Sequence, residues 1–536
     1  RLLHFNNYSV SGLTYGIDIE TTGLNPLTSK IALLQIYNPA LYKVFIYKVF
    51  NEPLTEKEKQ LLAGVRFVAH NASFERSFMP YLKHLDCSMI AYHAATSDKR
   101  TGLSDLSSKT GITYDNKKVM QVSDWSGELT EEQLEYAAKD AKATYILWDI
   151  YKDKNKPVYD RMYKASFIID DYARRGLPVD VEALSQLRID TERRRDELLQ
   201  KLIDLGFEEI ITPAKNIRTK KELMDKVTPD VMKIVEEVRS TNSLLNNMIS
   251  GVENKIVNGR LPINVLICGT ETGRLSTINP NVQNFPRSGF RHIFKAKEGY
   301  RFVRADFSGQ ELRMVAAMST EKVMIEAFNA GKDLHTLMAA KLNNMSAKTF
   351  LEQPKDWQKV ERQKAKAANF GFLYGMGAAK FIVTAKRDYN IDLSEEEALA
   401  IKNKFWNTYS FLKKWSEKER AACRIRGYAL TRGGRKRYFE DIDKAYCEMI
   451  NTAVQGSCGE VLLETLLALP DYLKGYLVNT VHDELIFEIP EHLVNDEAKY
   501  TEIKNHITGA MIKGVNKVEP RYPTLNITEI KDTDKL

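Results

Sequence analysis

Acidic residues in the first 140 positions have the types and order of a metal site that cleaves phosphodiesters. Asp18 and Glu20 lie two positions apart in the β-type run YGIDIE, so the pleat places both carboxylates on one face. Tyr136 and Asp140 lie four apart in a helical pattern and share a helix face. Glu75, in VAHNASFERSF, lies between these pairs in the sequence. Four carboxylates could hold two Mg²⁺ ions, with Tyr136 orienting an attacking water. A lone Asp-x-Glu pair is more often a solvated strand edge, so the inference depends on the whole set.

A second pair of acids lies far apart in the chain. Asp306 ends the β-type run YRFVRAD and precedes a turn, a position where rigid scaffolds often carry functional side chains. Asp483 and Glu484 interrupt the apolar strands of LVNTVHDELIFEI, and buried charge is costly unless it is paired or bound to a metal. An exposed hairpin tip is the alternative. Only folding could bring Asp306 and Asp483 together.

The stretch RQKAKAANFGFLYGMG, between these acids, predicts a helix with its chemistry on one face. Arg362, Lys366, Phe370 and Tyr374 recur every four residues and therefore follow one stripe. Two cations suit a triphosphate, and two aromatic rings can stack on a sugar or a base. An ordinary amphipathic core helix would bury the aromatic residues but would rarely place Arg and Lys on the same stripe. We therefore expect a nucleotide-binding helix.

The first acid cluster needs a sheet and a helix to hold it. Short β-rich runs in the first 155 residues (LTYGIDIE, KIALLQIYN, YKVFIYKVF and VRFVAHN) alternate with helix-like stretches, which predicts an α/β domain. Its last helix should begin at Thr130, where Thr-Glu-Glu-Gln forms a capping box. The polar run KDKNKP, which ends at Pro157, is typical of a linker.

The rest of the chain must position the second acid pair and the cationic helix. Long charged helical patterns extend over about 185–265. Their lysine-dense part, Lys215 to Lys226, could grip a nucleic-acid backbone or could be a solvated charged face. A β-type run that ends at Asp306, a helical block from about 320 to 425, and a final strand pair with a helix complete the chain.

The composition fits a protein of several compact units. A length of 536 residues corresponds to about three or four domains of roughly 100–200 residues each. Hydrophobic residues make up 43% and charged residues 28%, which excludes wholesale disorder. The formal net charge of +7 is compatible with a polyanionic partner. No apolar run approaches the roughly 18 residues of a membrane span, and the N-terminus lacks an export pattern. Five scattered cysteines without a C-x-x-C pair argue against a disulfide framework and a zinc site.

The motifs resemble those of one known family in their order as well as their residues. The set Asp18, Glu20, Glu75, Tyr136 and Asp140 resembles a 3′–5′ proofreading exonuclease domain of the DEDD type. DFSGQELR, R-x-x-x-K-x-x-x-F-G-x-x-Y-G and VHDE resemble motifs A, B and C of family A DNA polymerases, the bacterial DNA polymerase I type, and GTETGRLSTINPNVQNFPR is also similar to that family. The resemblance spans nearly the whole chain. It implies an α/β RNase H-like exonuclease domain followed by a right-hand α+β polymerase domain.

The resemblance also implies roles for the residues that match the motifs. Asp306 and Asp483 would bind two Mg²⁺ ions, and Lys366 would neutralise the triphosphate and protonate the leaving group. Glu311 would occupy the space that a ribose 2′-hydroxyl needs, so deoxynucleotides are favoured. The outer phosphates would contact Arg362 and His335, the nascent base pair would contact Phe370 and Tyr374, and the primer terminus would lie near Arg274, Gln455, Asn451, His482 and Glu484.

The chain departs from the family pattern at the middle exonuclease motif. Glu75 stands where the family usually has Asp, and the extra methylene moves the carboxylate by roughly one bond length, which bears on the exonuclease rate. Glutamate keeps the charge, so we expect activity. The His-Asn-x-x-Phe-Glu-Arg form of this motif, with no segment for a 5′-nuclease domain, is similar to viral or organellar members, and flap removal is not expected.

The expected protein has a 3′–5′ exonuclease domain over 1–155 and a polymerase domain over 156–536. The polymerase divides into a thumb of about 185–265, a palm of about 266–330 and 438–536, and fingers of about 331–437. We expect template-directed addition of deoxynucleoside monophosphates to a primer 3′ end, with editing of mismatched ends. Each active site would use two Mg²⁺ ions, for which Mn²⁺ can substitute.

The expected partners are primer–template DNA, dNTPs, and a single-stranded 3′ end in the exonuclease site. We expect a monomer without a membrane, in the cytoplasm of a bacterium or virus-infected cell or in an organelle, and not secreted. Reverse transcription stays open, because Glu311 does not screen the 2′-hydroxyl of a template. A single-subunit RNA polymerase and a catalytically inactive nucleic-acid-binding relative stay open as well.

Overall fold

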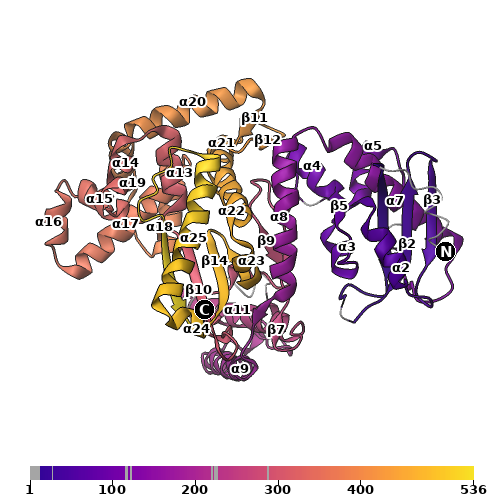
Figure 1. The fold of residues 1–536 in the computed structure, drawn as a ribbon. Helices are drawn as coiled ribbons and strands as arrows, with labels where there is room; N and C mark the ends of the chain where they lie inside the picture. The colour runs from indigo at the N-terminus through magenta and orange to yellow at the C-terminus, as the bar shows by residue number, and fades with distance from the viewer. Residues whose placement is uncertain are drawn as a thin grey trace.

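Helix α8 (Lys156–Arg175) runs between two units of the molecule, as Figure 1 shows. A five-stranded sheet with its helices lies on one side of α8, and the C-terminal elements lie on the other. The computed structural model describes residues 12–26, 28–99, 101–114, 119–120, 123–218, 221, 227–286 and 289–536. No helix in this described part of the chain combines the length and the apolar character that a membrane span requires.

The N-terminal unit contains a mixed sheet in the order β3-β2-β1-β4-β5. Its strands are β1 (Thr14–Thr21), β2 (Ile31–Asn38), β3 (Lys43–Lys48), β4 (Arg66–Ala69) and β5 (His84–Cys87). The expected alternation of strands and helices is wrong for the first three strands, which form an antiparallel meander. Strands β4 and β5 add in parallel and follow helices α2 (Glu56–Ala63) and α3 (Ser73–Phe78). The α/β prediction therefore holds from β3 onward.

Helix α7 (Glu131–Tyr151) lies against the sheet and begins where the sequence predicts. The Thr130 side chain accepts a hydrogen bond from the Gln133 backbone N–H, and Gln133 completes the capping box. A Cβ built at Gly16 would lie 2.2 Å from the Ala141 carbonyl oxygen, so glycine allows the helix to approach β1 closely. This contact fixes the height of Asp140 relative to the strand. The other helical segments here are α4 (Ser88–Thr96), a 3₁₀ turn (Leu103–Leu106) and α5 (Ser107–Thr110).

The prediction of a linker at KDKNKP is wrong, because this segment is a turn followed by the first residues of a helix. Residues 152–155 make a turn directly after α7, and Pro157 lies in the first turn of α8, where its missing N–H costs nothing. Helix α8 packs on the N-terminal unit through a 2.6 Å ion pair between Arg76 and Asp170 and a 2.5 Å hydrogen bond from the Tyr159 hydroxyl to Asp86. The two units are therefore joined by a packed helix.

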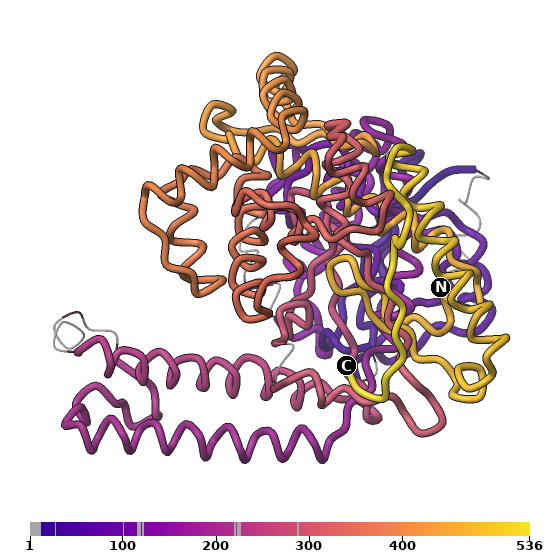
Figure 2. Tube along the Cα trace, turned by 90° about the vertical axis from the view of Figure 1, so that its left-hand side faces the viewer, coloured from indigo at the N-terminus to yellow at the C-terminus, as the bar shows by residue number. Residues whose placement is uncertain are grey.

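Two long helices project from the body as an arm, which Figure 2 shows most clearly. Helix α9 (Val181–Asp204) runs outward, and α11 (Pro229–Ser243) returns beside it and continues through a π-helical turn (Leu244–Ile249) into α12 (Ser250–Glu253). The arm has its own apolar cluster, which includes Leu202, Val235 and Val238. In the lysine-dense segment, Lys215 pairs with Asp196 at 2.8 Å, whereas 219–220 and 222–226 lie outside the described residues.

An antiparallel sheet in the order β13-β14-β10-β15 forms the centre of the C-terminal unit. Its strands are β10 (Tyr300–Phe307), β13 (Leu477–Val481), β14 (Glu484–Pro490) and β15 (Thr528–Thr533), and the sequence did not predict β15. Alternate residues of β14 pack in two apolar clusters, Leu485 and Phe487 in one and Ile486 in the other, so both faces are covered. Helices α22 (Ser457–Ala468) and α25 (Glu497–Val518) pack against each other beside this sheet.

A helical block fills the chain between β10 and the hairpin of β11 (Tyr428–Leu430) and β12 (Lys436–Tyr438). It comprises α13 (Gln310–Ser319), α14 (Lys322–Asn329), α15 (Leu334–Leu342), α16 (Ala347–Leu351), α17 (Lys355–Leu373), α18 (Ala378–Tyr389), α19 (Glu395–Thr408) and α20 (Ser410–Arg426). The smaller elements are β6 (Leu177–Pro178), β7 (Arg260–Leu261), β8 (Asn264–Leu266), β9 (Ser276–Ile278), α21 (Tyr446–Asn451), α23 (Asp471–Tyr476) and α24 (Glu491–Asn495), and 3₁₀ turns at Glu208–Ile210, Val282–Asn284 and Arg291–Ile293.

Candidate active sites

The first acid cluster assembles between β1 and α7. Asp18 and Glu20 point to the same side of β1, and Asp140 reaches them from the helix. One ligand oxygen from each of these three carboxylates lies within 4.8 Å of the others. The cluster opens into a cleft of about 530 Å³, which Glu75 and Tyr136 also line. The structure thus brings together all five residues predicted from the sequence.

Glu75 reaches the cleft from α3 and is 2% exposed. Its charge is one of the causes that raise the pKa values of Asp18 and Glu20, which places it beside the three-carboxylate group. Arg76, the next residue, pairs with Asp170 of α8 and so fixes α3. The longer side chain at this position therefore still brings its carboxylate into the cleft, beside the three carboxylates whose oxygens lie within 4.8 Å of one another.

Burial and mutual repulsion hold these carboxylates close to neutrality. Burial is the main cause that raises the pKa of Asp18 well above its usual range, followed by the charge of Asp140. The same causes raise the pKa of Glu20 to about 8, and burial raises the pKa of Glu75 to about 8. Carboxylates that repel one another in a buried cleft are a donor set that fits hard divalent cations, which prefer oxygen ligands and displace the protons.

The raised pKa values of these carboxylates predict that a bound divalent ion stabilises the folded protein more at high pH than at low pH. Because the folded pKa values of Glu20 and Glu75 lie above the unfolded values, the folded state holds more protons between about pH 4.5 and 8, and the free energy of unfolding of the metal-free protein should fall as pH rises through that window. A divalent ion should restore it. Thermal unfolding in EDTA and in Mg²⁺ should therefore differ more at pH 8.5 than at pH 6, by about 2–4 °C for each kcal/mol of binding in a cooperative unit of roughly 150–250 residues, the size of the exonuclease unit. The double variant D18N/E20Q should reduce the gain, and an equal gain at both pH values would contradict the prediction.

Two aromatic residues of this site were missed by sequence reasoning. Trp125 is 5% exposed, lines the cleft and has its ring centroid 6.4 Å from that of Tyr136. Tyr114 has its ring centroid 5.9 Å from that of Tyr136, and burial, followed by the charge of Asp140, raises the pKa of Tyr114. Neither residue belongs to a recognisable motif, so the sequence carries no signal for them.

The second acid pair meets at one end of the C-terminal sheet. Asp306 lies directly opposite Glu484 in the β10–β14 register, and the Phe307 N–H donates to the Asp483 carbonyl at 3.2 Å. Asp483 lies in the two-residue turn between β13 and β14, where His482 adopts a φ of +56°. Burial, followed by the charge of Asp306, raises the pKa of Asp483 to about 7. The two aspartates, distant in the sequence, are therefore neighbours.

A chain of polar contacts connects this sheet end to the cationic helix. Glu311, in the first turn of α13, accepts hydrogen bonds from Arg274 and from the Tyr374 hydroxyl. The charges of Arg274 and Glu311 both act on the pKa of Asp483, so the contacts lie beside the acid pair. Tyr374 is the C-cap residue of α17, one position past the helix that the sequence predicted to include it.

Helix α15 places His335 beside the cationic face of α17. Arg362 pairs with Asp333 at 2.8 Å, and the Asn369 side chain lies 3.0 Å from His335 Nδ1. Burial lowers the pKa of His335 to about 4, and the charges of Arg362 and Lys366 act in the same direction. The His335 and Phe370 rings lie 5.7 Å apart. Lys366 lies eight residues before Tyr374, about 12 Å along the helix axis from the end tied to Glu311.

The other predicted primer-end residues flank the same sheet end. Asn451 ends α21, and Gln455 lies in a π-helical turn (Thr452–Gly456), a feature frequent at functional sites. The Asn451 Oδ1 is buried and has no hydrogen-bond partner among the described residues. Glu484 is 5% exposed and pairs with Arg304 at 2.6 Å.

The geometry defines a class of protein. A cleft with four converging carboxylates, followed by an antiparallel sheet that joins two aspartates near a cationic helix, is the arrangement of a nucleic-acid polymerase with an editing nuclease.

Comparison with known proteins identifies the family. Residues 186–519 match the family model for DNA polymerase family A, and residues 8–154 match that for a 3′–5′ exonuclease. The chain belongs to DNA polymerase family A and carries a 3′–5′ exonuclease domain. The expected family, enzyme class and fold class are therefore confirmed.

Relatives agree with this assignment over most of the chain. The chain is 27% identical to DNA polymerase I of Aquifex aeolicus over 92% of both proteins, and 26% identical to DNA polymerase I of Borreliella burgdorferi over 91% of this chain and 59% of that protein. It is 28% identical to the thermostable DNA polymerase I of Thermus aquaticus over 68% of this chain and 48% of that protein. A solved structure, the POL domain of Pol1 from M. smegmatis in complex with DNA primer-template and dNTP, superposes with a TM-score of 0.75 at 18% identity, covering 100% of this chain and 97% of that one, and supports the fold.

Proposed function

We propose that the protein extends a DNA primer on a DNA template from dNTPs at the second acid pair and removes mismatched 3′ ends at the first acid cluster. The observation that carries the proposal is the approach of Asp306 and Asp483 beside the Glu311–Arg274–Tyr374 contacts. In the reaction, the primer 3′-oxygen forms a bond to the α-phosphorus of the dNTP, the bond to pyrophosphate breaks, and the hydroxyl proton leaves. The solved Pol1 domain in complex with primer-template and dNTP supports these partners.

The carboxylates at the sheet end suit a pair of divalent ions. Asp306 and Asp483 would hold these ions, which when bound supply activation of the 3′-hydroxyl and neutralisation of the phosphates. Burial, followed by repulsion from Asp306, raises the pKa of Asp483, and a bound cation would relieve both effects. We propose Mg²⁺, two ions at each site, with Mn²⁺ as a substitute.

The cationic face of α17 would bind the triphosphate. Arg362 and His335 would contact the outer phosphates, and Lys366 would donate a proton to the departing pyrophosphate. In the structure Arg362 pairs with Asp333, but both side chains are more than 40% exposed, so exchanging this partner for a phosphate costs only about 0–1 kcal/mol. Phe370, next to His335, would pack on the incoming nucleotide.

The selection of deoxyribose would depend on Glu311. Hydrogen bonds from Tyr374 and Arg274 hold the two oxygens of its carboxylate, so the carboxylate cannot easily move aside to make room for a ribose 2′-hydroxyl. Arg274 would also reach the minor groove at the primer terminus, where every base pair presents acceptors. Asn451, Gln455, His482 and Glu484 would line the same terminus.

The exonuclease cleft would hydrolyse the terminal phosphodiester. Asp18, Glu20, Glu75 and Asp140 would hold the divalent ions, and Tyr136 would orient the attacking water. The hydroxyl of Tyr136 suits this role because burial and the charge of Asp140 raise its pKa, so it remains a hydrogen-bond donor. A single-stranded 3′ end would be the substrate.

The same proposal assigns a domain to each part of the chain. The exonuclease domain would occupy 1–155, and 156–536 would form the polymerase, with the arm as thumb (about 185–265), the C-terminal sheet as palm (about 266–330 and 438–536) and the block around α17 as fingers (about 331–437). A monomer acting in a cytoplasm or an organelle remains the prediction.

Primer extension tests the proposal directly. A labelled primer on DNA and on RNA templates, with dNTPs or rNTPs, should be extended with dNTPs on DNA in Mg²⁺ and not in EDTA, and mismatched 3′ ends should be trimmed. Preferential use of rNTPs would favour an RNA polymerase. Extension on RNA at the rate seen on DNA would establish reverse transcription. No metal-dependent turnover at all would leave only a nucleic-acid-binding relative.

A further inference from the structure

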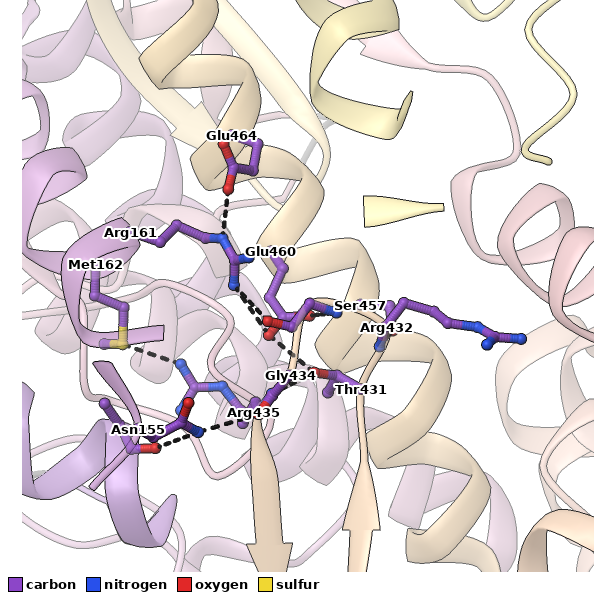
Figure 3. Close-up of polar contacts among 12 residues, drawn as sticks. Asn155, Arg161, Met162, Thr431, Arg432, Gly434, Arg435, Ser457, Glu460 and Glu464 are labelled. Atoms are coloured by element: carbon purple, nitrogen blue, oxygen red, sulfur yellow. Dashed lines mark hydrogen bonds and ion pairs between the residues drawn. The ribbon is translucent and has the colours of Figure 1, made fainter. Parts of the chain in front are cut away.

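The turn between β11 and β12, residues Thr431–Arg435, lies where the exonuclease unit meets the polymerase unit (Figure 3). From the exonuclease side, Asn155 Nδ2 donates to the carbonyls of Gly434 and Ala94, each at 3.1 Å. The Ser97 hydroxyl, at the end of α4, donates to the Lys436 carbonyl at 2.8 Å. The hairpin of the polymerase unit is therefore bonded directly to the nuclease.

From the polymerase side, Glu460 of α22 holds the same turn. It is 2% exposed and accepts hydrogen bonds of 2.8 Å from the Thr431 hydroxyl and the Gly433 N–H. Arg161 of α8 donates to Glu464 at 2.7 Å and to Glu460 at 3.3 Å, so the carboxylates have a buried cationic partner. These contacts leave the turn little freedom.

Arg435, the last residue of this turn, has one of the largest fully buried side chains and is 1% exposed. Its Nη2 lies 3.0 Å from the Met162 sulfur and its Nη1 lies 3.5 Å from the His93 carbonyl oxygen, both weak contacts. Its Nε has no hydrogen-bond partner among the described residues. The charge of Glu460 favours the charged form of this guanidinium, but its direct side-chain hydrogen bonds go to weak acceptors, so its burial is costly.

The guanidinium lies against the backbone that leads to Arg274. A Cβ built at Gly273 would fall 2.4 Å from Nε and 2.6 Å from Cζ of Arg435, and Gly273 has a φ of +80°, so both space and backbone conformation require glycine there. Helix α22 also approaches this segment, because a Cβ built at Gly459 would lie 3.3 Å from the Gly273 carbonyl oxygen and 3.4 Å from the Arg274 Cα. The segment at Gly273 and Arg274 is thus in close contact with both Arg435 and α22.

We infer that Arg435 is a positioning residue for Arg274, supported by Met162 of helix α8, and that its contact to the His93 carbonyl makes the exonuclease unit part of the support for the polymerase site. The inference rests on the role proposed for Arg274 at the primer terminus. Displacing the Gly273 backbone moves the start of the Arg274 side chain and so weakens its contact with Glu311. Arg435 itself touches no reacting atom and acts through Arg274.

A double-mutant cycle on single-nucleotide extension tests the inference. Arg435→Met removes the cation at similar length, Arg274→Ala removes the residue that it positions, and the double variant combines them. We expect Arg435→Met to lower kcat/KM at a matched primer end by about tenfold, the scale of coupling between neighbouring residues, and to have no further effect in the Arg274→Ala background. Arg435→Lys, which keeps the charge, should recover part of the loss.

Three readouts make the outcome decisive. Degradation of single-stranded DNA should be unchanged in Arg435→Met, because a general loss of fold would lower it as well. Arg432→Met removes a cation from the same turn, but its side chain points away from the cluster (Figure 3) and pairs with Glu519 at 2.9 Å, so its effect should multiply with that of Arg274→Ala. If Arg435→Met does not fold, Met162→Leu, which keeps the volume, should give a smaller loss that also vanishes without Arg274.

The possible failures are distinguishable. Extension by Arg274→Ala at the rate of the unmodified protein would refute the proposed role of Arg274. A clear loss in Arg274→Ala that multiplies with the loss in Arg435→Met would leave that role standing and overturn the positioning inference.

Discussion

Asp306→Ala is expected to lower the rate of primer extension by about a thousandfold or more, because a bound metal contributes several kcal/mol to the transition state and each 1.36 kcal/mol is tenfold. Asp306 lies beside Asp483 at the sheet end, and its charge raises the pKa of that neighbour. Single-turnover extension of a labelled primer with saturating dNTP and Mg²⁺ measures the effect. Degradation of single-stranded DNA should continue at its normal rate.

The stability of the Asp306→Ala variant separates lost chemistry from lost fold. Removing one of two repelling carboxylates should leave the metal-free protein at least as stable as before, so the melting temperature in EDTA should not fall. Asp471→Ala is a matched control, since the Asp471 side chain is 97% exposed at the start of α23. Retained extension in Asp306→Ala would refute the assignment of the palm site.

Asp18→Ala is expected to have the second large effect, a loss of 3′-end degradation by about a thousandfold for the same reason. Asp18 is central in its cluster, because the charges of Asp140, Glu20 and Glu75 all act on its pKa. Release of nucleotides from a labelled single strand measures the loss, whereas extension of a matched primer should be unaffected. Mismatched primer ends should then persist and slow synthesis.

A matched control exists on the same unit. Asp149→Ala removes an exposed carboxylate near the end of α7, where it pairs with Lys152, and should change neither activity. If Asp18→Ala still degrades 3′ ends, the editing site lies elsewhere in the molecule.

The sequence predicted the first acid site from an ordered set of acidic residues, and the second because acids among apolar strands are costly without a function. Asp483 and Glu484 lie at the turn that joins two buried apolar strands, and the capping box at Thr130 sets the start of α7 and so the position of Asp140. These signals depend on residues that are close together in the sequence, so they can be recognised without a structure. Motif order then supplied the family, which the family models confirm.

What the sequence could not predict depends on contacts between distant segments. β15 pairs with β10 across more than 200 positions, and its short polar pattern TEIKDT carries no strand signal. The contacts of Glu311 with Arg274 and Tyr374 join three separate segments. Arg435 was missed because, in an isolated sequence, a basic run is typical of an exposed surface.

Helix α8 has a consequence for how the two activities exchange a substrate. Its buried ion pairs, Arg76 with Asp170 on one side and Arg161 with Glu460 and Glu464 on the other, fasten the nuclease to the body without a hinge. Moving the nuclease toward the growing end would break the Arg76–Asp170 pair if α8 stayed with the body, or the Arg161 pairs if α8 moved with the nuclease, at about 3–5 kcal/mol for each largely buried pair. We therefore expect the DNA to move instead. A frayed primer end passes from the polymerase site to the exonuclease site while the two protein units keep their relative positions.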